Sequence, residues 1–115
     1  MEEVPAHWPT PWIRASLELA ILSVLTGGDL HGYAIAERLA DAGMGRLKGG
    51  SLYPVLARLE EAALVEAVWQ PGSSGPRRKA YAITPSGREE RRRLLEQWNG
   101  LTLLLIETLP QGGSS

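Results

Sequence analysis

Residues 48–59, which read KGGSLYPVLARL, carry the clearest structural signal in the chain. The large apolar residues of this stretch recur with the i, i+3, i+4, i+7 spacing of one helix face: Leu52, Val55, Leu56 and Leu59. Ser51 is a suitable cap, and Pro54 falls in the first turn, where its missing N–H breaks no hydrogen bond. The opposite face is basic and rich in hydrogen-bonding groups: Lys48, Ser51, Tyr53 and Arg58. The stretch therefore predicts a short helix with an apolar back and a basic front.

Two interpretations of this helix are open. Most amphipathic helices only cover a hydrophobic core, and two cations on a solvated face need no partner. The functional interpretation is that the basic front is pressed against an anion such as DNA. The sequence on either side of the stretch has to separate the two.

Charge is distributed unevenly along the 115 residues, whose net charge is −1. Residues 46–93 hold 10 Lys and Arg against 5 Asp and Glu, whereas the remainder holds 2 against 8. A basic segment inside a neutral chain is typical of a nucleic-acid footprint. The chain has no cysteine, which excludes disulfides and thiolate metal sites. We find no membrane-spanning apolar run and no signal-peptide pattern, so we expect a cytoplasmic protein without membrane partners.

The flanking segments predict a mainly α fold with a small β-hairpin. Residues 17–25 read as a first helix, and a second helix starts near Asp29 or His31 and ends before Gly43. Residues 64–69 and 77–83 read as strands, because β-forming residues flank a loop rich in Pro, Gly and Ser. Three helices followed by a hairpin with an Arg-Arg-Lys run near its tip form a winged helix-turn-helix.

A last helix is predicted to begin at Pro85, with Thr84 as its cap, and to run to about Leu109. Two apolar stripes run along it: Leu94, Trp98, Leu101 and Leu105 on one, and Leu95, Thr102, Ile106 and Leu109 on the other. Two stripes exceed what one small core requires, so we expect this helix to pair with a partner helix. The residues expected at this dimer interface are Leu94, Trp98, Leu101, Leu105 and Leu109.

The predicted organisation has four parts. Residues 1–15 form an irregular arm rich in Trp and Pro, and residues 16–84 form the winged helix-turn-helix. Residues 85–110 form the dimerisation helix, and residues 111–115 form a disordered tail. The apolar surface of Trp8 and Trp12 in the arm requires a place to dock, either on the domain or on a partner subunit.

Four sequence blocks together resemble the PadR family of bacterial transcriptional regulators, in its order and spacing. The blocks are LELAILSVL at 17–25, LHGYAI at 30–35, GSLYPVLARLEE at 50–61 and RKAYAITPSG at 78–87. The single C-terminal helix is similar to that of the smaller PadR subfamily, whereas the N-terminal arm departs from the family pattern. The resemblance implies a homodimeric repressor that binds a palindromic operator. It also implies, as in some members, a small-molecule effector near the dimer interface.

Nine residues are candidates for DNA contacts: His31, Tyr33, Lys48, Ser51, Tyr53, Arg58, Arg77, Arg78 and Lys79. The helix at 48–59 would enter the major groove, and the hairpin cations would neutralise phosphates or reach the minor groove. Structural alternatives stand beside these roles. Tyr53 fits partial core packing, His31 fits a helix cap, and Arg58 fits an ion pair with an acid such as Glu61. We interpret the arginines at 91–93 as a solvated helix face.

Tryptophan is the residue type that suggests an effector site. Trp98 lies on the predicted dimer stripe, where an indole suits the stacking of flat or cationic ligands. The alternative is that Trp98 only fills the interface. Trp8 and Trp12 are further candidates to line or close the same pocket.

Two other functional classes compete with a DNA-binding regulator: an enzyme and a protein–protein adapter. An enzyme is not expected, because the chain has two histidines, no acidic cluster with catalytic or metal-ligand spacing, and no phosphate-binding glycine loop. No metal and no cofactor are predicted. The stronger alternative is a winged-helix adapter that dimerises or docks on another regulator without binding DNA. Such an adapter has no need of the basic front.

Overall fold

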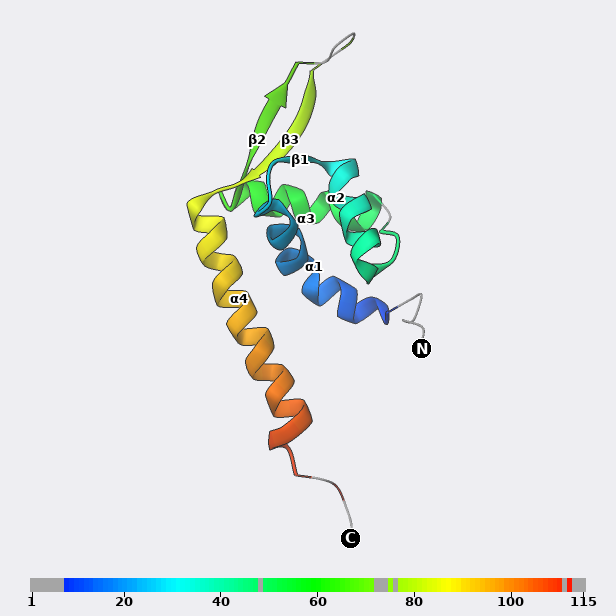
Figure 1. Ribbon diagram of the computed structural model, residues 1–115, viewed down its shortest axis with the longest axis vertical. Coiled ribbons are helices and arrows are strands. Elements are labelled where there is room, and N and C mark those ends of the chain that lie inside the picture. The colour runs from blue at the N-terminus through cyan, green and yellow to red at the C-terminus, as the bar shows by residue number, and fades with distance from the viewer. Residues whose placement is uncertain (1–7, 48, 72–74, 76, 111, 113–115) are drawn as a thin grey trace.

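Three helices, a small antiparallel sheet and a long final helix follow one another along the chain (Figure 1). The computed structural model describes residues 8–47, 49–71, 75, 77–110 and 112. In order, the elements are α1 (Thr10–Leu25), β1 (Leu30–His31), α2 (Gly32–Leu39), a wide helical turn (Ala40–Met44), α3 (Gly49–Glu61), β2 (Val65–Gln70), β3 (Arg78–Ile83), α4 (Pro85–Leu103) and a second wide turn (Leu104–Thr108). The predicted mainly α fold with a β-hairpin is confirmed.

The sheet has the strand order β1-β3-β2, with both pairs antiparallel. In the hairpin, Val65 lies opposite Ile83 and Gln70 lies opposite Arg78. Each predicted hairpin strand agrees with the structure to within one residue. The strand β1, which pairs Leu30 with Tyr81, was not predicted because two residues are too short to show a period.

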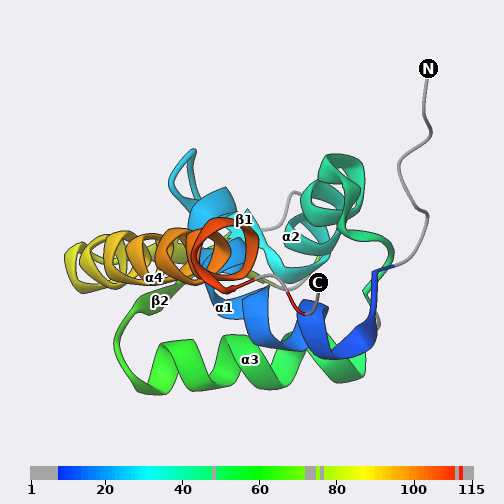
Figure 2. The same cartoon turned by 90° about the horizontal axis from the view of Figure 1, so that it is seen from below.

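The core lies where α1, α2 and α3 face one another and the base of the sheet (Figure 2). All four apolar residues predicted for the back of α3 are buried there: Leu52, Val55, Leu56 and Leu59. The other helices and strands contribute Leu17, Ile21, Leu22, Leu25, Ile35, Leu39, Val65, Ala80 and Tyr81. The back of α3 is thus held by the core, and its front remains available.

The first helix begins at Thr10, which corrects the helix start predicted at residue 17 and, over residues 10–15, the irregular arm predicted over 1–15. Pro9 and Pro11 stand at the helix start, where a proline's missing N–H costs no hydrogen bond. In the sequence, prolines at these positions are equally compatible with irregular structure. Ser16 lies inside this helix, where its hydroxyl donates to the carbonyl of Trp12 at 2.8 Å. Residues 1–7 of the arm lie outside the described residues.

The start of α4 is fixed to the turn between α3 and β2. Thr84 caps the helix by accepting a hydrogen bond from the Gly87 N–H at 3.0 Å, as the sequence predicted. Its hydroxyl donates to the carbonyl of Ala63 at 2.8 Å, and its N–H donates to the carbonyl of Leu64 at 3.1 Å. Gly87 is buried so closely against this turn that an added Cβ would lie 2.1 Å from the Leu64 carbonyl oxygen.

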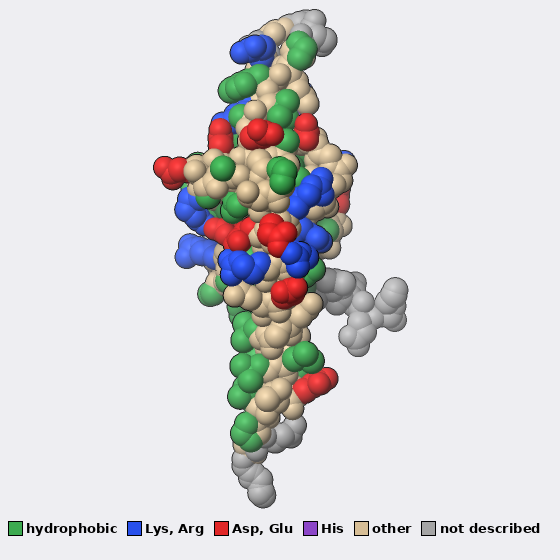
Figure 3. All heavy atoms as spheres, turned by 90° about the vertical axis from the view of Figure 1, so that its left-hand side faces the viewer, with side chains coloured by type: hydrophobic (Ala, Val, Ile, Leu, Met, Phe, Trp, Pro, Cys, Tyr) green, Lys and Arg blue, Asp and Glu red, His purple; other side chains and the backbone are tan. Residues whose placement is uncertain are grey.

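Beyond its first turns, α4 projects away from the other helices (Figure 1). Hydrophobic side chains gather along this projecting part in the space-filling view (Figure 3). The projecting part comprises the later turns of α4 and the wide turn that follows it. Its exposed hydrophobic residues, which extend to Leu109 just after that turn, are Leu95, Leu101, Leu103, Leu104, Leu105, Ile106 and Leu109. Among the helices of the described residues, none is long and apolar enough to cross a membrane. The tail predicted to be disordered lies outside the described residues, apart from Gly112.

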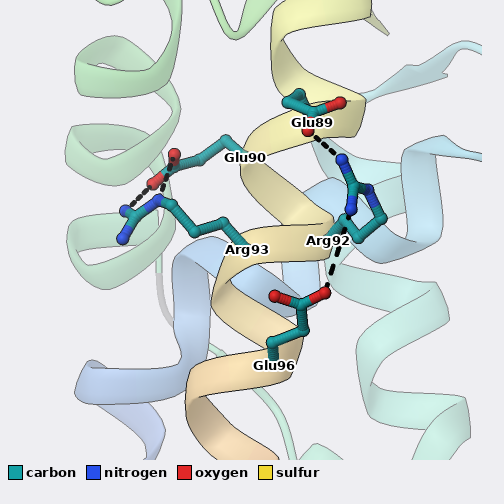
Figure 4. A network of polar contacts seen from close by, with 5 residues as sticks. All are labelled: Glu89, Glu90, Arg92, Arg93 and Glu96. Carbon is teal, nitrogen blue, oxygen red and sulfur yellow. Dashed lines mark hydrogen bonds and ion pairs between the residues drawn. The ribbon is translucent and has the colours of Figure 1, made fainter.

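The polar first half of α4 carries its own ion pairs (Figure 4). Arg92 pairs with Glu89 and Glu96, and the Arg93 guanidinium donates to Glu90 at 3.0 Å. The bond to Arg93 holds the pKa of Glu90 below its ordinary value. The remaining member of the predicted solvated face, Arg91, is instead half-buried and donates from Nε to the Ser23 hydroxyl of α1 at 3.0 Å.

Candidate nucleic-acid interface and aromatic cavity

The front of α3 is exposed at Ser51 and, for 47% of its surface, at Tyr53. Tyr53 lies over the first residue of α2, because a Cβ built on Gly32 would lie 2.6 Å from the Tyr53 Cε1 atom. The bare glycine therefore leaves space for the ring, which packs on one side and faces solvent on the other. The partial packing that the sequence suggested for Tyr53 is therefore present, and its exposed side remains available for the proposed DNA contact. Lys48, the predicted contact before it, lies outside the described residues.

The third predicted contact on α3, Arg58, forms an ion pair. Its Nη2 lies 3.1 Å from the Glu18 carboxylate of α1, so the acid partner is Glu18 and not the suggested Glu61. Beside this pair, Arg14 of α1 lines a groove with Ser51 and Arg58. Arg14 makes no ion pair within the part of the chain that the structure describes. We had not selected Arg14, because the predicted helix start left it in the arm.

The start of α2 places its two candidates differently. His31 has the extended backbone of an N-cap residue, but its side chain makes no capping hydrogen bond, and its Nε2 atom is buried. Tyr33 is 68% exposed and so lies on the surface. A hydrogen bond with Glu37 raises the pKa of Tyr33 above its ordinary value.

The three candidate cations of the hairpin differ in whether they contact an acidic residue. Lys79 donates to Glu60 of α3 at 3.1 Å and lies 5.2 Å from the Tyr81 ring centre. The bond to Glu60 raises the pKa of Lys79. This lysine therefore ties the hairpin to α3. Arg77 and Arg78 are exposed and have no acidic partner among the residues described.

An aromatic residue that we had not selected lies beside these cations. Trp69 of β2 is half exposed, and the Arg77 guanidinium lies 6.0 Å from its ring centre. This spacing lies at the outer limit of a cation–π contact, which would restrain the arginine above the ring. The sequence contained no signal for this contact beyond a tryptophan at the end of the predicted strand 64–69, because the register that places Trp69 opposite Lys79 appears only in the fold.

A cavity of about 340 Å³ lies where α1, the α2–α3 connection and α4 approach one another. Its walls are Trp8, Trp12, Ile13, Ser16, Ala42, Gly43, Met44 and Trp98. The structure thus brings together the three tryptophans proposed as effector contacts. None of the lining residues is charged. The wall formed by residues 42–44 was not foreseen, because it depends on how the connection folds back toward α1.

Trp8 docks on its own domain, which answers one question that the sequence left open. Its indole N–H donates to the Gly43 carbonyl oxygen at 2.8 Å. Gly43 has φ 113°, a conformation that other residues rarely adopt, so the direction of this carbonyl depends on the glycine. This hydrogen bond therefore joins Trp8, which lines the aromatic cavity, to the connection between α2 and α3.

A family model described as the transcriptional regulator PadR-like family matches residues 21–93. The chain belongs to this family. The PadR-like match spans the helix-turn-helix, the hairpin and the start of α4. Trp8, Trp12 and Trp98 fall outside it. PadR-like regulators bind DNA and are generally not enzymes. The described residues contain no cluster of three or more histidines and acids that could hold a metal ion.

Individual PadR-like and related proteins extend this comparison. Transcriptional regulator Rv3488 of Mycobacterium tuberculosis is 37% identical over 87 residues, covering 73% of this chain and 79% of its own. A 37.1 kDa protein of transposon TN4556 from Streptomyces fradiae is 40% identical over 72 residues, which cover 63% of this chain but only 20% of that protein. The structure of PadR-like regulator BC4206 from Bacillus cereus superposes with a TM-score of 0.76 at 28% identity, covering 91% of this chain and all of that one.

Proposed function

We propose that this PadR-like regulator is a cytoplasmic homodimeric repressor that binds a palindromic operator and is released by a flat aromatic effector. The observation that carries the DNA-binding part is the pair of exposed arginines on the hairpin, Arg77 and Arg78, together with the exposed Ser51 and Tyr53 on the front of α3. In this arrangement α3 enters the major groove, and the hairpin arginines reach phosphates or the minor groove. The assignment as a repressor follows from the family likeness.

Positive charge in the groove between α1 and α3 supports DNA binding by the front of α3. Arg14 and Arg58 line this groove together with the Ser51 hydroxyl. Glu18 offsets Arg58, which leaves the Arg14 charge to attract a phosphate. We therefore add Arg14 to the proposed contacts and assign Arg58 and Lys79 mainly to holding α3 and the hairpin in place.

The projecting half of α4 supports the homodimer. An exposed row of leucines and isoleucine on a single helix is costly in water and is suited to pairing with a second copy. Two copies related by a two-fold axis present two α3 helices, which is the arrangement that a palindrome requires. Two half-sites also combine their contacts without a second association cost.

Reversing the hairpin charges tests the DNA-binding proposal. The Arg77→Glu/Arg78→Glu variant should bind operator DNA roughly 100-fold more weakly, because each protomer replaces two phosphate-binding cations with anions. Fluorescence anisotropy on labelled upstream DNA measures the change. A matched control is Arg38→Glu/Arg88→Glu, which reverses two exposed arginines on α2 and α4.

The control is expected to bind within about threefold of the wild type, because specific contacts are lost only at the hairpin. Unchanged binding by the hairpin variant contradicts the proposed interface. If the wild-type dimer binds no DNA either, the adapter function is the better account.

The cavity supports the effector part of the proposal. Its volume of about 340 Å³ accommodates a small ligand, and pockets of this kind are mostly apolar with a few polar groups. Three indoles line it without any charged side chain, which favours flat neutral or cationic aromatic compounds over anions. We propose that a small aromatic molecule occupies this cavity.

Removing one indole tests this assignment. With 2-naphthol as the probe, calorimetry should detect binding to the wild type and about tenfold weaker binding to Trp98→Ala, which loses a stacking face. Trp69→Ala removes an indole from the hairpin instead and should bind the probe as the wild type does. Absence of 2-naphthol binding to the wild-type dimer contradicts the effector site.

A further inference from the structure

Trp8 is the residue of the N-terminal arm whose structural role the family likeness does not explain. Its side chain is in contact with two features at once. The indole ring forms part of the cavity wall, and the indole N–H donates to the Gly43 carbonyl oxygen at 2.8 Å. The hydrogen bond links residues 35 positions apart, so it fixes Trp8, just before α1, to the helix-turn-helix connection.

The connection that Trp8 contacts leads directly into α3. It leaves α2 through the wide turn Ala40–Met44 and passes through two glycines, Gly43 and Gly45, with φ of 113° and 90°. Glycines allow these angles but also make the backbone easy to rearrange. Partly buried Met44 and Leu47 pack against the core on either side of the second glycine. The Trp8 hydrogen bond therefore restrains the part of the connection that is least restrained by its own sequence.

We propose that Trp8 is a positioning residue that couples the aromatic cavity to the recognition helix α3. In the empty cavity, the indole holds the Gly43 carbonyl and keeps α3 in the orientation that binds DNA. A ligand that stacks in the cavity displaces the indole, releases this carbonyl and lowers the affinity for DNA. The ligand part of this inference rests on the effector function proposed above, whereas the positioning part does not.

The hydrogen bond between Trp8 and Gly43 lies at the surface, so it can break and re-form. Trp8 is 38% exposed, so water can replace the indole donor when the side chain moves. One hydrogen bond of this kind shifts an equilibrium by roughly two- to tenfold. A larger response to ligand requires additional contacts, since a ligand shifts an equilibrium only by its difference in affinity for the two states.

The Trp8→Phe variant separates the two roles of the residue. Phenylalanine keeps an aromatic ring at the cavity but has no N–H to donate. Trp12→Phe is the matched control, because Trp12 lines the same cavity and its indole makes no hydrogen bond among the residues described. Without ligand, we expect Trp8→Phe to bind operator DNA about three- to tenfold more weakly and Trp12→Phe to bind within about twofold of the wild type.

Two further measurements distinguish positioning from a general structural role. In the presence of 2-naphthol, DNA affinity should fall for the wild type but not further for Trp8→Phe, although calorimetry still detects naphthol binding to the variant. Hydrogen exchange of the free protein, followed by mass spectrometry, should be faster over residues 40–47 in Trp8→Phe and unchanged there in Trp12→Phe.

The outcomes separate this inference from the proposed function. Wild-type-like DNA affinity and wild-type-like exchange over residues 40–47 in Trp8→Phe overturn the positioning role. A wild type that binds DNA but no naphthol removes the ligand part alone. A wild type that binds no DNA contradicts the proposed function, and the exchange measurement, which needs no DNA, still tests whether Trp8 restrains the connection.

Discussion

Gly87→Ala is expected to lower the free energy of unfolding by about 3 kcal/mol, because the added methyl overpacks a site with no free space. The new Cβ would lie 2.1 Å from the Leu64 carbonyl oxygen and 2.8 Å from a side-chain carbon of Ile83. The carbonyl belongs to the backbone, so α4 has to move away from the turn that Thr84 fixes. Urea unfolding at one protein concentration measures the loss.

Gly27→Ala is the matched control for this prediction. There the added Cβ lies 3.8 Å from the Val24 carbonyl oxygen, which is an ordinary contact. We expect a change within about 0.5 kcal/mol. Equal stability of the two variants would show that α4 is not anchored at Gly87 in the way that the contacts indicate.

Placing two carboxylates on the projecting part of α4 is expected to abolish the homodimer. Leu101→Glu/Leu105→Glu changes two exposed residues of the predicted interface stripe, and pairing would bury both charges without partners. Operator affinity should then fall roughly 100-fold or more, because each monomer occupies one half-site alone. Sedimentation velocity and anisotropy measure the two effects on the same samples.

Gln97→Glu serves as the control on the same helix. Gln97 is exposed and lies outside both predicted apolar stripes, so this variant should remain dimeric and bind DNA as the wild type does. A doubly substituted protein that sediments as a dimer, or a wild type that sediments as a monomer, contradicts the proposed interface.

Features that depend on neighbouring residues were predictable from the sequence. The buried stripe of α3 follows from a 3.6-residue period, and the cap at Thr84 with Pro85 behind it is a local signal. The hairpin was predicted to within one residue at each strand end because a loop rich in Pro, Gly and Ser separates two β-forming segments.

Features that depend on tertiary packing were not predictable. The pairs of Arg58 with Glu18 and of Lys79 with Glu60 join separate elements, and no spacing in the sequence indicates them. Prolines can either start a helix or prevent one, so the start of α1 at Thr10 was missed. The sequence indicated a pocket shared by three tryptophans, but its wall at Gly43 depends on the path of the connection.

The most direct test of DNA recognition is the binding of the purified protein to its own upstream DNA across a series of salt concentrations. We expect a specific complex of one dimer per palindrome. If six to eight phosphates are neutralised per dimer, the logarithm of the binding constant should fall against the logarithm of salt with a slope of roughly −5 to −7. Failure of an intact dimer to bind this DNA specifically, even at low salt, would contradict the proposed operator function.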